Sequence, residues 1–239
     1  MSLRVDFCDH AAAKHAVMHW HYSKTVPIGK LVKLGVWEDD DFIGVVMFGR
    51  GASNAYGTRF GVGMTEVCEL VRVALKEHAT PVTQLVALSL KKLKESSPGL
   101  RVVVSFADSG ESHLGTIYQA GNWTYLGTTT KRHDYFYHGR WVHDRIVNAP
   151  TMQGVLPEVA AGVTYAELKA TLPKRVASVK FRYAYPLDKK MRRLLNTMAL
   201  PYPTAEDLAA QVSEARHRTT GSEGQVQSLG AAPLPHGIG

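Results

Sequence analysis

Side chains of the kinds that transfer protons follow a strand that the sequence predicts to be buried. Ser105 and Asp108 lie at or just past the end of the apolar run 102–104, and Tyr118 lies on a short helical stretch that ends at Gly121. Open α/β sheets bind ligands at the carboxyl ends of strands covered on both faces. A hydroxyl, a carboxylate and a phenol in this position could handle a proton during catalysis. An ordinary strand and helix with a core tyrosine is the alternative explanation.

A second polar group follows a predicted helix over residues 11–20, where Pro27 and Gly29 indicate a loop. Together its side chains offer hydrogen-bond donors and acceptors, an aromatic face and positive charge. The alternative is a plain helix end, where His and Lys are favoured by the helix dipole. The group consists of His21, Tyr22, Ser23, Lys24 and Lys30.

The third group is Glu69 and Arg72 in the predicted strand 66–75. Strict alternation along a strand would place Glu69 on a face with valines and Arg72 on the opposite face. A carboxylate on an apolar face is expected to have a raised pKa, which makes Glu69 a candidate general base. A structural ion pair between Glu69 and a nearby arginine is the other interpretation.

The elements that must position these residues alternate between strands and helices. We expect an α/β or α+β fold in which helices flank a mixed central sheet. Thr80 and Pro81 favour the N-cap and the first position of a central helix. The expected strands are 4–8, 33–37, 42–48, 66–75, 102–104 and a final hairpin of 123–126 with 135–142, in which Tyr135, Tyr137 and Trp141 share a face.

The composition is that of a soluble globular protein, with 45% hydrophobic and 21% charged residues in a chain of 239. No apolar run has the length that a membrane helix needs, and the start of the chain lacks the apolar segment of a signal peptide. Two cysteines, Cys8 and Cys68, do not form a disulfide framework. We therefore expect a cytoplasmic protein that does not bind membranes.

The net charge of +7 is concentrated in residues 174–193, where eight Lys and Arg residues accompany the single acid Asp188. Such a footprint suits a phosphate backbone. A solvated helix whose charges only aid solubility is the alternative. In an extended stretch, Phe181, Tyr183 and Tyr185 would face one way and Arg182 the other. The predicted phosphate contacts here are Arg182, Lys189, Lys190, Arg192 and Arg193, in addition to Lys24 and Lys30.

Three segments follow from these patterns. Residues 1–145 are expected to form a catalytic domain and residues 146–212 a basic helical extension. The Gly, Ser, Gln and Pro-rich residues 213–239 lack apolar periodicity and predict a disordered tail.

Taken together, the motifs resemble those of the Mom family of phage DNA-modification proteins. The resemblance covers residues 5–145 and a second patch over 180–194. It implies a fold like that of GNAT acetyltransferases, and the conversion of adenine in double-stranded DNA to a carbamoylmethyl derivative on its exocyclic amine, which protects phage DNA from restriction in the infected cell. The matching motifs are His21-Tyr22-Ser23, the strand 66–75, Ser105-Phe106-Ala107-Asp108, Tyr118 with Gly121-Asn122-Trp123, and 181–190.

The resemblance assigns the catalytic work to these motifs. Asp108 or Glu69 would take a proton from the amine, and Tyr118 would protonate the leaving side. Arg72 would bind a carboxylate of the donor. The candidate catalytic residues are His21, Tyr22, Ser23, Glu69, Arg72, Ser105, Asp108, Tyr118 and Asn122.

The cofactor is left open by the sequence. Acetyltransferases bind pyrophosphate with a glycine-rich loop before the central helix, whereas residues 76–83 contain no glycine and Pro81 lacks an amide donor. This argues against acetyl-CoA. The family is associated with iron, but His15 and His19 have no evident third ligand, so we predict no metal-binding residues. An acyl-CoA N-acyltransferase acting on a small molecule or protein, and an inactive DNA-binding module, are the alternative functions; the oligomeric state stays open.

Overall fold

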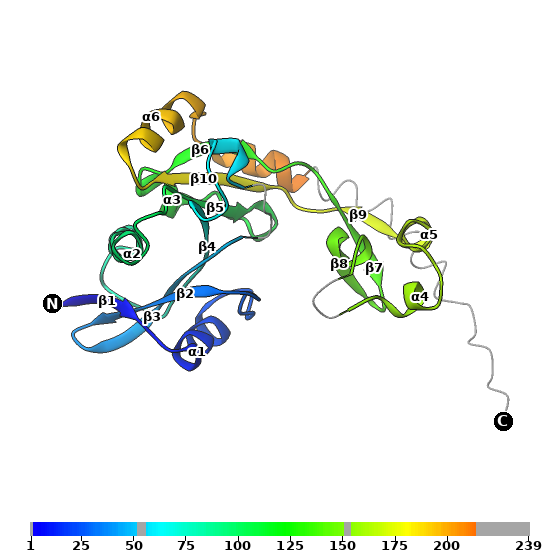
Figure 1. Cartoon of the computed structure of the whole chain (residues 1–239), viewed down its shortest axis with the longest axis horizontal. Coiled ribbons are helices and arrows are strands. Elements are labelled where there is room, and N and C mark those ends of the chain that lie inside the picture. The colour runs from blue at the N-terminus through cyan, green and yellow to red at the C-terminus, as the bar shows by residue number, and fades with distance from the viewer. Residues whose placement is uncertain (1, 52–55, 151–153, 214–239) are drawn as a thin grey trace. The chain divides into compact units, whose positions relative to one another are not determined.

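The computed structural model describes residues 2–51, 56–150 and 154–213, and it divides the chain into two compact units. The main unit comprises residues 1–107, 115–127 and 181–202. The second unit comprises residues 108–114, 128–180 and those from 203 onward. Figure 1 labels the α-helices and β-strands. In chain order the elements are β1 (Leu3–Phe7), α1 (His10–Trp20), β2 (Leu31–Glu38), β3 (Asp41–Gly49), η1 (Thr58–Phe60), β4 (Val67–Leu75), α2 (Val82–Ser96), β5 (Val102–Asp108), η2 (Ser109–Glu111), α3 (Thr116–Ala120), β6 (Thr124–Thr128), β7 (His133–Tyr137), β8 (Arg140–His143), η3 (Asp144–Val147), α4 (Pro157–Ala160), α5 (Tyr165–Thr171), β9 (Lys174–Val176), β10 (Lys180–Pro186) and α6 (Lys189–Met198).

The main unit is built on a seven-stranded sheet with the order β1-β2-β3-β4-β5-β10-β6. The first four strands pair antiparallel in sequence order, whereas β4 and β5 are parallel and are joined by α2. A mixed central sheet flanked by helices is therefore confirmed.

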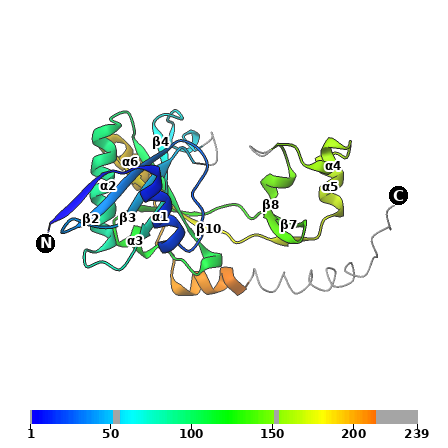
Figure 2. The same ribbon diagram turned by 90° about the horizontal axis from the view of Figure 1, so that it is seen from below.

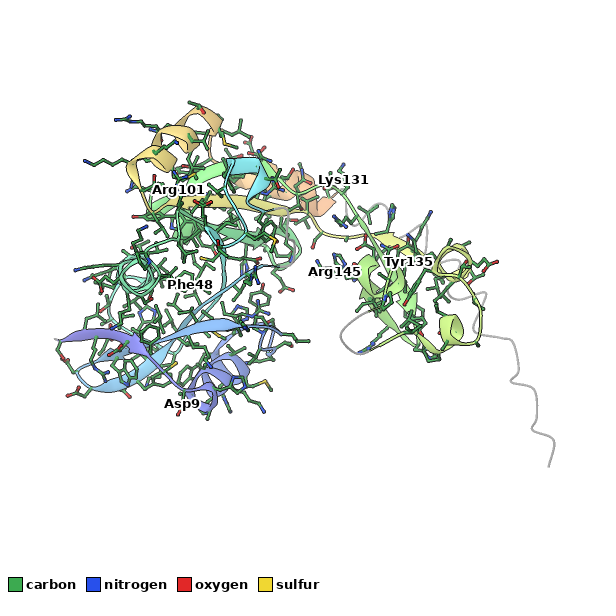
Figure 3. The ribbon with its side chains drawn as sticks, in the orientation of Figure 1. Asp9, Phe48, Arg101, Lys131, Tyr135 and Arg145 are labelled. Atoms are coloured by element: carbon green, nitrogen blue, oxygen red, sulfur yellow. The ribbon has the colours of Figure 1, made fainter. Side chains whose placement is uncertain are left out.

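Helices cover both faces of this sheet, and Figure 1 shows α1 and α2 on opposite sides of the first strands. The turned view in Figure 2 shows α1 in front of β3, where Ala13, Ala16 and Val17 pack against Val45 and Met47. Asp9, labelled in Figure 3, begins α1 as its N-cap by accepting a hydrogen bond of 2.7 Å from the Ala12 amide. The helix ends at Trp20, directly before the polar group His21–Ser23, so the position of α1 sets the position of this group.

Helix α6 and strand β10 belong to the main unit, although the sequence pattern assigned them to a basic extension. Arg101, labelled in Figure 3, precedes β5 and holds Asp188, the N-cap of α6, with an Nε–Oδ2 distance of 2.7 Å. Met191 and Leu195 on α6 pack in one core cluster with Val104 of β5. The basic helix is thus an integral layer of the sheet unit.

The second unit has its own small core. Strands β8-β7-β9 form a three-stranded sheet, and Tyr135, Tyr137 and Leu168 pack together beneath it. The expected hairpin of 123–126 with 135–142 is therefore wrong, because β6 lies beside β10, which comes from a distant part of the sequence. Trp141 does not share the Tyr135 face either; it pairs with Phe136, at 5.4 Å between ring centroids.

No helix in the described part of the chain is both long enough and apolar enough to cross a membrane. The predicted disorder of the tail concerns residues that lie outside the described ranges.

Candidate active site

The parallel ladder between β4 and β5 ends early, and this end organises the site. Only three pairs form it, of which Glu69↔Val104 is the last, although both strands continue beyond. One step further, the Ser105 hydroxyl donates to the Leu70 carbonyl oxygen over 2.9 Å. We call the unpaired part of the two strands beyond Glu69 and Val104 the β4–β5 fork. A side chain thus replaces a backbone hydrogen bond at the base of the fork.

The Tyr118 phenol meets Ser105 at the base of the fork, with 2.7 Å between the two hydroxyl oxygens. Because a carbonyl only accepts, the single Ser105 proton is directed to Leu70, and Tyr118 is the donor to Ser105 Oγ. Burial raises the pKa of Tyr118 to about 12, and the negative charge of Glu69 contributes in the same direction. Tyr118 therefore keeps its proton at neutral pH and presents a fixed donor.

The neighbours of Tyr118 explain why it is held so well. Its ring lies 5.1 Å from the centroids of both Trp123 and Tyr183. Gly115, the N-cap of α3, has a φ of 80°, and a β-carbon there would come within 3.0 Å of the Tyr118 ring. Only glycine allows both this backbone conformation and this close approach. The sequence analysis did not single out Gly115, although a glycine directly before a short helix was the available signal.

A β-bulge at Val71 corrects the expected faces of β4. Phe48 pairs with Leu70 and Met47 pairs with Arg72, so Val71 is the extra residue. Glu69 is opposite Gly49, and Met47 and Gly49 share one face of β3. Glu69 and Arg72 therefore lie on the same face, not on opposite ones as simple alternation predicted.

Arg72 fastens the loop after α1 to this face. Its Nε and Nη2 donate to the Thr25 carbonyl oxygen over 3.2 and 3.1 Å, and its Nη1 donates to the Val71 carbonyl oxygen. Burial lowers the pKa of Arg72, while the negative charges that Tyr22 and Glu69 can carry oppose the shift. Arg72, Tyr22 and Glu69 are thus close enough to interact electrostatically.

The loop after α1 also carries His21, Tyr22 and Ser23. The buried His21 Nδ1 accepts from the Ser23 amide over 3.1 Å and lies 2.9 Å from Ser23 Oγ. An accepting Nδ1 places the proton of the neutral ring on Nε2. The Tyr22 ring lies 4.3 Å from the His21 ring and is 54% exposed, so one aromatic face is open to solvent.

Asp108 belongs to the second unit and is engaged there by three groups. Its carboxylate accepts from Ser178 Oγ over 2.7 Å and from the Gly110 amide over 2.9 Å, and it lies 3.1 Å from Lys180 Nζ. These contacts tie the turn after β5 to the start of β10. Asp108 thus has a clear structural role, and a catalytic role for it remains a prediction.

The remaining predicted residues lie on the surface. Asn122 is exposed in the turn after α3 with a φ of 57°, a conformation that asparagine tolerates. Lys24 donates to the His19 carbonyl oxygen over 2.8 Å and so closes the end of α1, while Lys30 is exposed just before β2. Arg182 is half-buried within β10, and the exposed cations of α6 are Lys189, Lys190, Arg192 and Arg193.

Residues 2–204 match the Mom protein family. The chain belongs to this family. A relative in Escherichia phage Mu, named methylcarbamoylase mom, is 28% identical over 210 residues, which cover 84% of this chain and 83% of the relative.

Solved acetyltransferases are also similar to this Mom family member. One from Bacillus subtilis, in complex with CoA, has a TM-score of 0.45 at 15% identity and covers 78% of this chain and 100% of its own. The aminoglycoside 6'-N-acetyltransferase from Enterococcus faecium has a TM-score of 0.42 at 9% identity, covering 84% and 99%.

In this Mom family member, a carboxylate of the chain itself binds the backbone amides of the loop before α2. Glu38 at the end of β2 accepts from the amides of Ala79 and Thr80 over 3.1 and 2.7 Å. Hydrogen bonds from the Thr80 side chain and from both amides lower the pKa of Glu38, so it is an anion at neutral pH. Helix α2 begins at Val82 with Pro81 as its N-cap, one residue later than predicted. Because these amides already bind an anion of the chain itself, the loop does not fit the pyrophosphate of CoA. Glu38 was not among the predicted residues, because it lies far from this loop in the sequence.

Within residues 2–51, 56–150 and 154–213, no three His, Cys, Asp or Glu side chains are grouped so that they could hold a metal ion. The His15 and His19 rings stack at 4.1 Å on α1, and the His19 Nδ1 bonds the His15 carbonyl oxygen.

Proposed function

We propose that this protein is a transferase that attaches a carbamoylmethyl group to the exocyclic amine of adenine in double-stranded DNA. Membership of the Mom family and a relative named methylcarbamoylase support a role in DNA modification. The observation that carries the proposal is the Tyr118–Ser105 pair at the β4–β5 fork. It supplies a fixed proton donor at the fork, where the charge of Glu69 acts on Tyr118.

The reaction forms one N–C bond and breaks one bond between the methylene carbon and a leaving group of an activated donor. The amine loses a proton, for which Glu69 is the candidate base. The leaving group gains the Tyr118 proton. Once Tyr118 is deprotonated, the Ser105 hydroxyl can turn from Leu70 and donate to the phenolate, which stabilises the charge that develops during transfer.

The adenine must leave the base stack to reach this site, at a cost of a few kcal/mol. The open face of Tyr22 offers a surface on which an extruded base can stack, and its ring is backed by His21. Arg72 holds the loop that carries both rings, and its remaining N–H donors are available to an anionic or carbonyl group of the donor.

The cations of α6 support a grip on the phosphate backbone. Lys189, Lys190, Arg192 and Arg193 occupy the first turns of a helix, where positive charge is disfavoured by the helix dipole. None of these four pairs with a carboxylate in the described part of the chain. Their placement therefore does not serve helix stability, and phosphate contacts explain it better.

The test is mass spectrometry of nucleosides from DNA of cells that express the protein. We expect a carbamoylmethyl derivative of deoxyadenosine. Glu69→Gln should lower its amount by about 10²-fold, the usual scale for a lost general base. Asp108→Asn retains acceptors for Ser178 and Gly110, so a loss of equal size in this variant would identify Asp108 as the base instead. If adenine stays unmodified in cells that contain the folded wild-type protein, the proposal is refuted.

A further inference from the structure

Two arginines lie on the face of the main sheet that also carries Glu69 and Arg72. Val67 and Val102 are paired, and their side chains pack in one cluster with Val104 and with Ala184 of β10. Arg182, two residues before Ala184, therefore points to the same face. Its guanidinium lies 6.0 Å from the Phe106 ring centroid.

The second arginine comes from a different segment. Arg59 of η1 is exposed, and its Nη2 donates to the Leu126 carbonyl oxygen over 3.4 Å. Leu126 belongs to β6, the strand beside β10, and it packs in one core cluster with Phe60 and with Ala184, so Arg59 lies over the strand next to that of Arg182. Burial lowers the pKa of Arg182, and the positive charge of Arg59 lowers it further.

Within the part of the chain that the structure describes, Arg182 lacks the carboxylate partner that other partly buried arginines of the main unit have, and the exposed Arg59 adds a second positive charge beside it. Arg101 is held by Asp188, and Arg72 interacts with Glu69. In the described residues, neither Arg59 nor Arg182 forms an ion pair with a carboxylate. Two like charges brought together and partly out of water are unfavourable unless an anion joins them. The pair is therefore arranged as a receptor for a negatively charged group.

A strip of side chains connects the pair to the fork. Phe106 lies two residues after Val104 on β5, so it shares the face of Val104 and of its partner Glu69, and the Tyr56 ring lies 5.9 Å from the Phe106 ring. Gly51 separates Tyr56 from Glu69: a β-carbon added there would overlap the Tyr56 ring and lie 2.8 Å from Glu69 Oε2. Anion site, aromatic rings and candidate base thus follow one another along one face.

We propose that Arg59 and Arg182 bind a phosphate, and that this is the backbone phosphate beside the nucleotide whose base enters the fork. Paired guanidinium groups present N–H donors in a geometry that suits phosphate oxygens. The assignment to DNA rests on the proposed function. The same chemistry would suit a phosphate of a free donor molecule, so the experiment separates the two sources.

The experiment uses the full-length protein and a fluorescein-labelled duplex that contains a single adenine. Arg182→Gln should weaken binding about 10-fold, as expected for the loss of a hydrogen bond to a charged group, and should lower the salt slope by about one. Arg59→Gln should act in the same direction, and because Arg59 is exposed, this variant protects the test against a folding defect. Arg4→Gln is the matched control, since Arg4 also lies over an aromatic ring, 3.9 Å from the Trp37 centroid, but on the edge strand β1.

A second set of duplexes locates the phosphate. Each carries one methylphosphonate, which removes the charge of a single phosphate on either side of the adenine. One of them should weaken wild-type binding about as much as Arg182→Gln does, with no further loss when the two changes are combined. If the losses add for every duplex, the assignment to this backbone phosphate is wrong.

Binding of inorganic pyrophosphate, measured by calorimetry, provides the other arm. If both arginine variants lose pyrophosphate binding but keep wild-type affinity for DNA, the anion site stands and its ligand is a small phosphate. If both variants bind DNA and pyrophosphate like the wild type, the anion site is refuted. Nucleoside analysis of the same variants tests the anion site separately from the proposed function. If the variants still modify adenine and bind both ligands like the wild type, the proposed function stands and only the anion site is refuted.

Discussion

The β4–β5 fork and helix α6 both carry candidate functional residues, but they are built in opposite ways. At the fork, the hydroxyls of Ser105 and Tyr118 are buried and each has a defined partner. On α6, four cations are exposed and none has a carboxylate partner in the part of the chain that the structure describes. The fork is organised to fix the position of one proton, and α6 presents charge without fixing any geometry. A reaction needs the former, whereas attraction to a polyanion needs only the latter.

The largest effect should come from breaking the fork. Tyr118→Phe and Ser105→Ala should each lower adenine modification by about 10²-fold or more, because the first removes the proton donor and the second removes the hydroxyl that orients it. DNA affinity and its salt slope should stay unchanged, since neither hydroxyl carries charge. Nucleoside mass spectrometry and anisotropy titrations measure the two effects.

The control for this change is Tyr183→Phe. Tyr183 stacks on Tyr118, but its hydroxyl accepts from Gln119 Nε2 over 3.2 Å and does not take part in the Ser105 contact. It should modify DNA normally. Equal losses in all three variants would show that activity does not depend specifically on the Tyr118–Ser105 pair.

Removing the cations of α6 should weaken DNA binding and its salt dependence, which the changes at the fork leave unchanged. The triple variant Lys189→Ala/Arg192→Ala/Arg193→Ala should bind every DNA sequence more weakly and reduce the salt slope by about three. On that scale, the affinity gap to the wild type should widen about 40-fold as salt falls from about 200 to about 50 mM. A slope equal to that of the wild type would mean that α6 does not touch DNA.

A smaller effect is expected at the loop that Glu38 closes. Glu38→Gln should lower the free energy of unfolding by about 1–3 kcal/mol at neutral pH, because one of two amides loses its anionic acceptor. The folded-state pKa of Glu38 is lowered, so its contribution is present above the unfolded pKa and is lost as pH falls through the folded one. Urea unfolding should therefore distinguish the variant from the wild type at neutral pH and no longer at strongly acidic pH.

Glu95→Gln, an exposed change at the far end of α2, is the matched control and should be neutral.

Calorimetry on the wild type should show no tight binding of acetyl-CoA. Tight, stoichiometric binding would overturn our interpretation of this loop and would favour an acyl-CoA N-acyltransferase.

The smallest effect concerns the stability of α6 itself. Lys189→Glu places a negative charge at the start of the helix and should raise the free energy of unfolding by about 0.3–1 kcal/mol, while it weakens DNA binding. Asn196→Glu, near the other end of the helix, should lower stability by a similar amount. Thermal unfolding of both variants tests the sign; a stability loss in Lys189→Glu would show that this lysine supports the helix.

The sequence by itself determined the parts of the molecule that depend on neighbouring residues. The valine run gave β5 its start, the spacing of Leu114, Ile117 and Tyr118 predicted the short helix that delivers the phenol, and Asp188 begins α6 as an N-cap. The concentration of charge on α6 was equally visible, because composition needs no fold. Periodicity and capping act over a few residues, so one sequence is enough to read them.

Only the tertiary structure decided which of these parts meet. The bulge at Val71 turned Arg72 to the face of Glu69, and β10 entered the sheet between β5 and β6, which brought Arg182 to that same face. Glu38 reaches the Thr80 amide across 42 residues of chain. Such pairings depend on register and on closing long loops, where many arrangements satisfy the same local pattern and packing selects one. For that reason residue types along the sequence could suggest candidate chemistry, whereas the arrangement of those residues had to come from the tertiary structure.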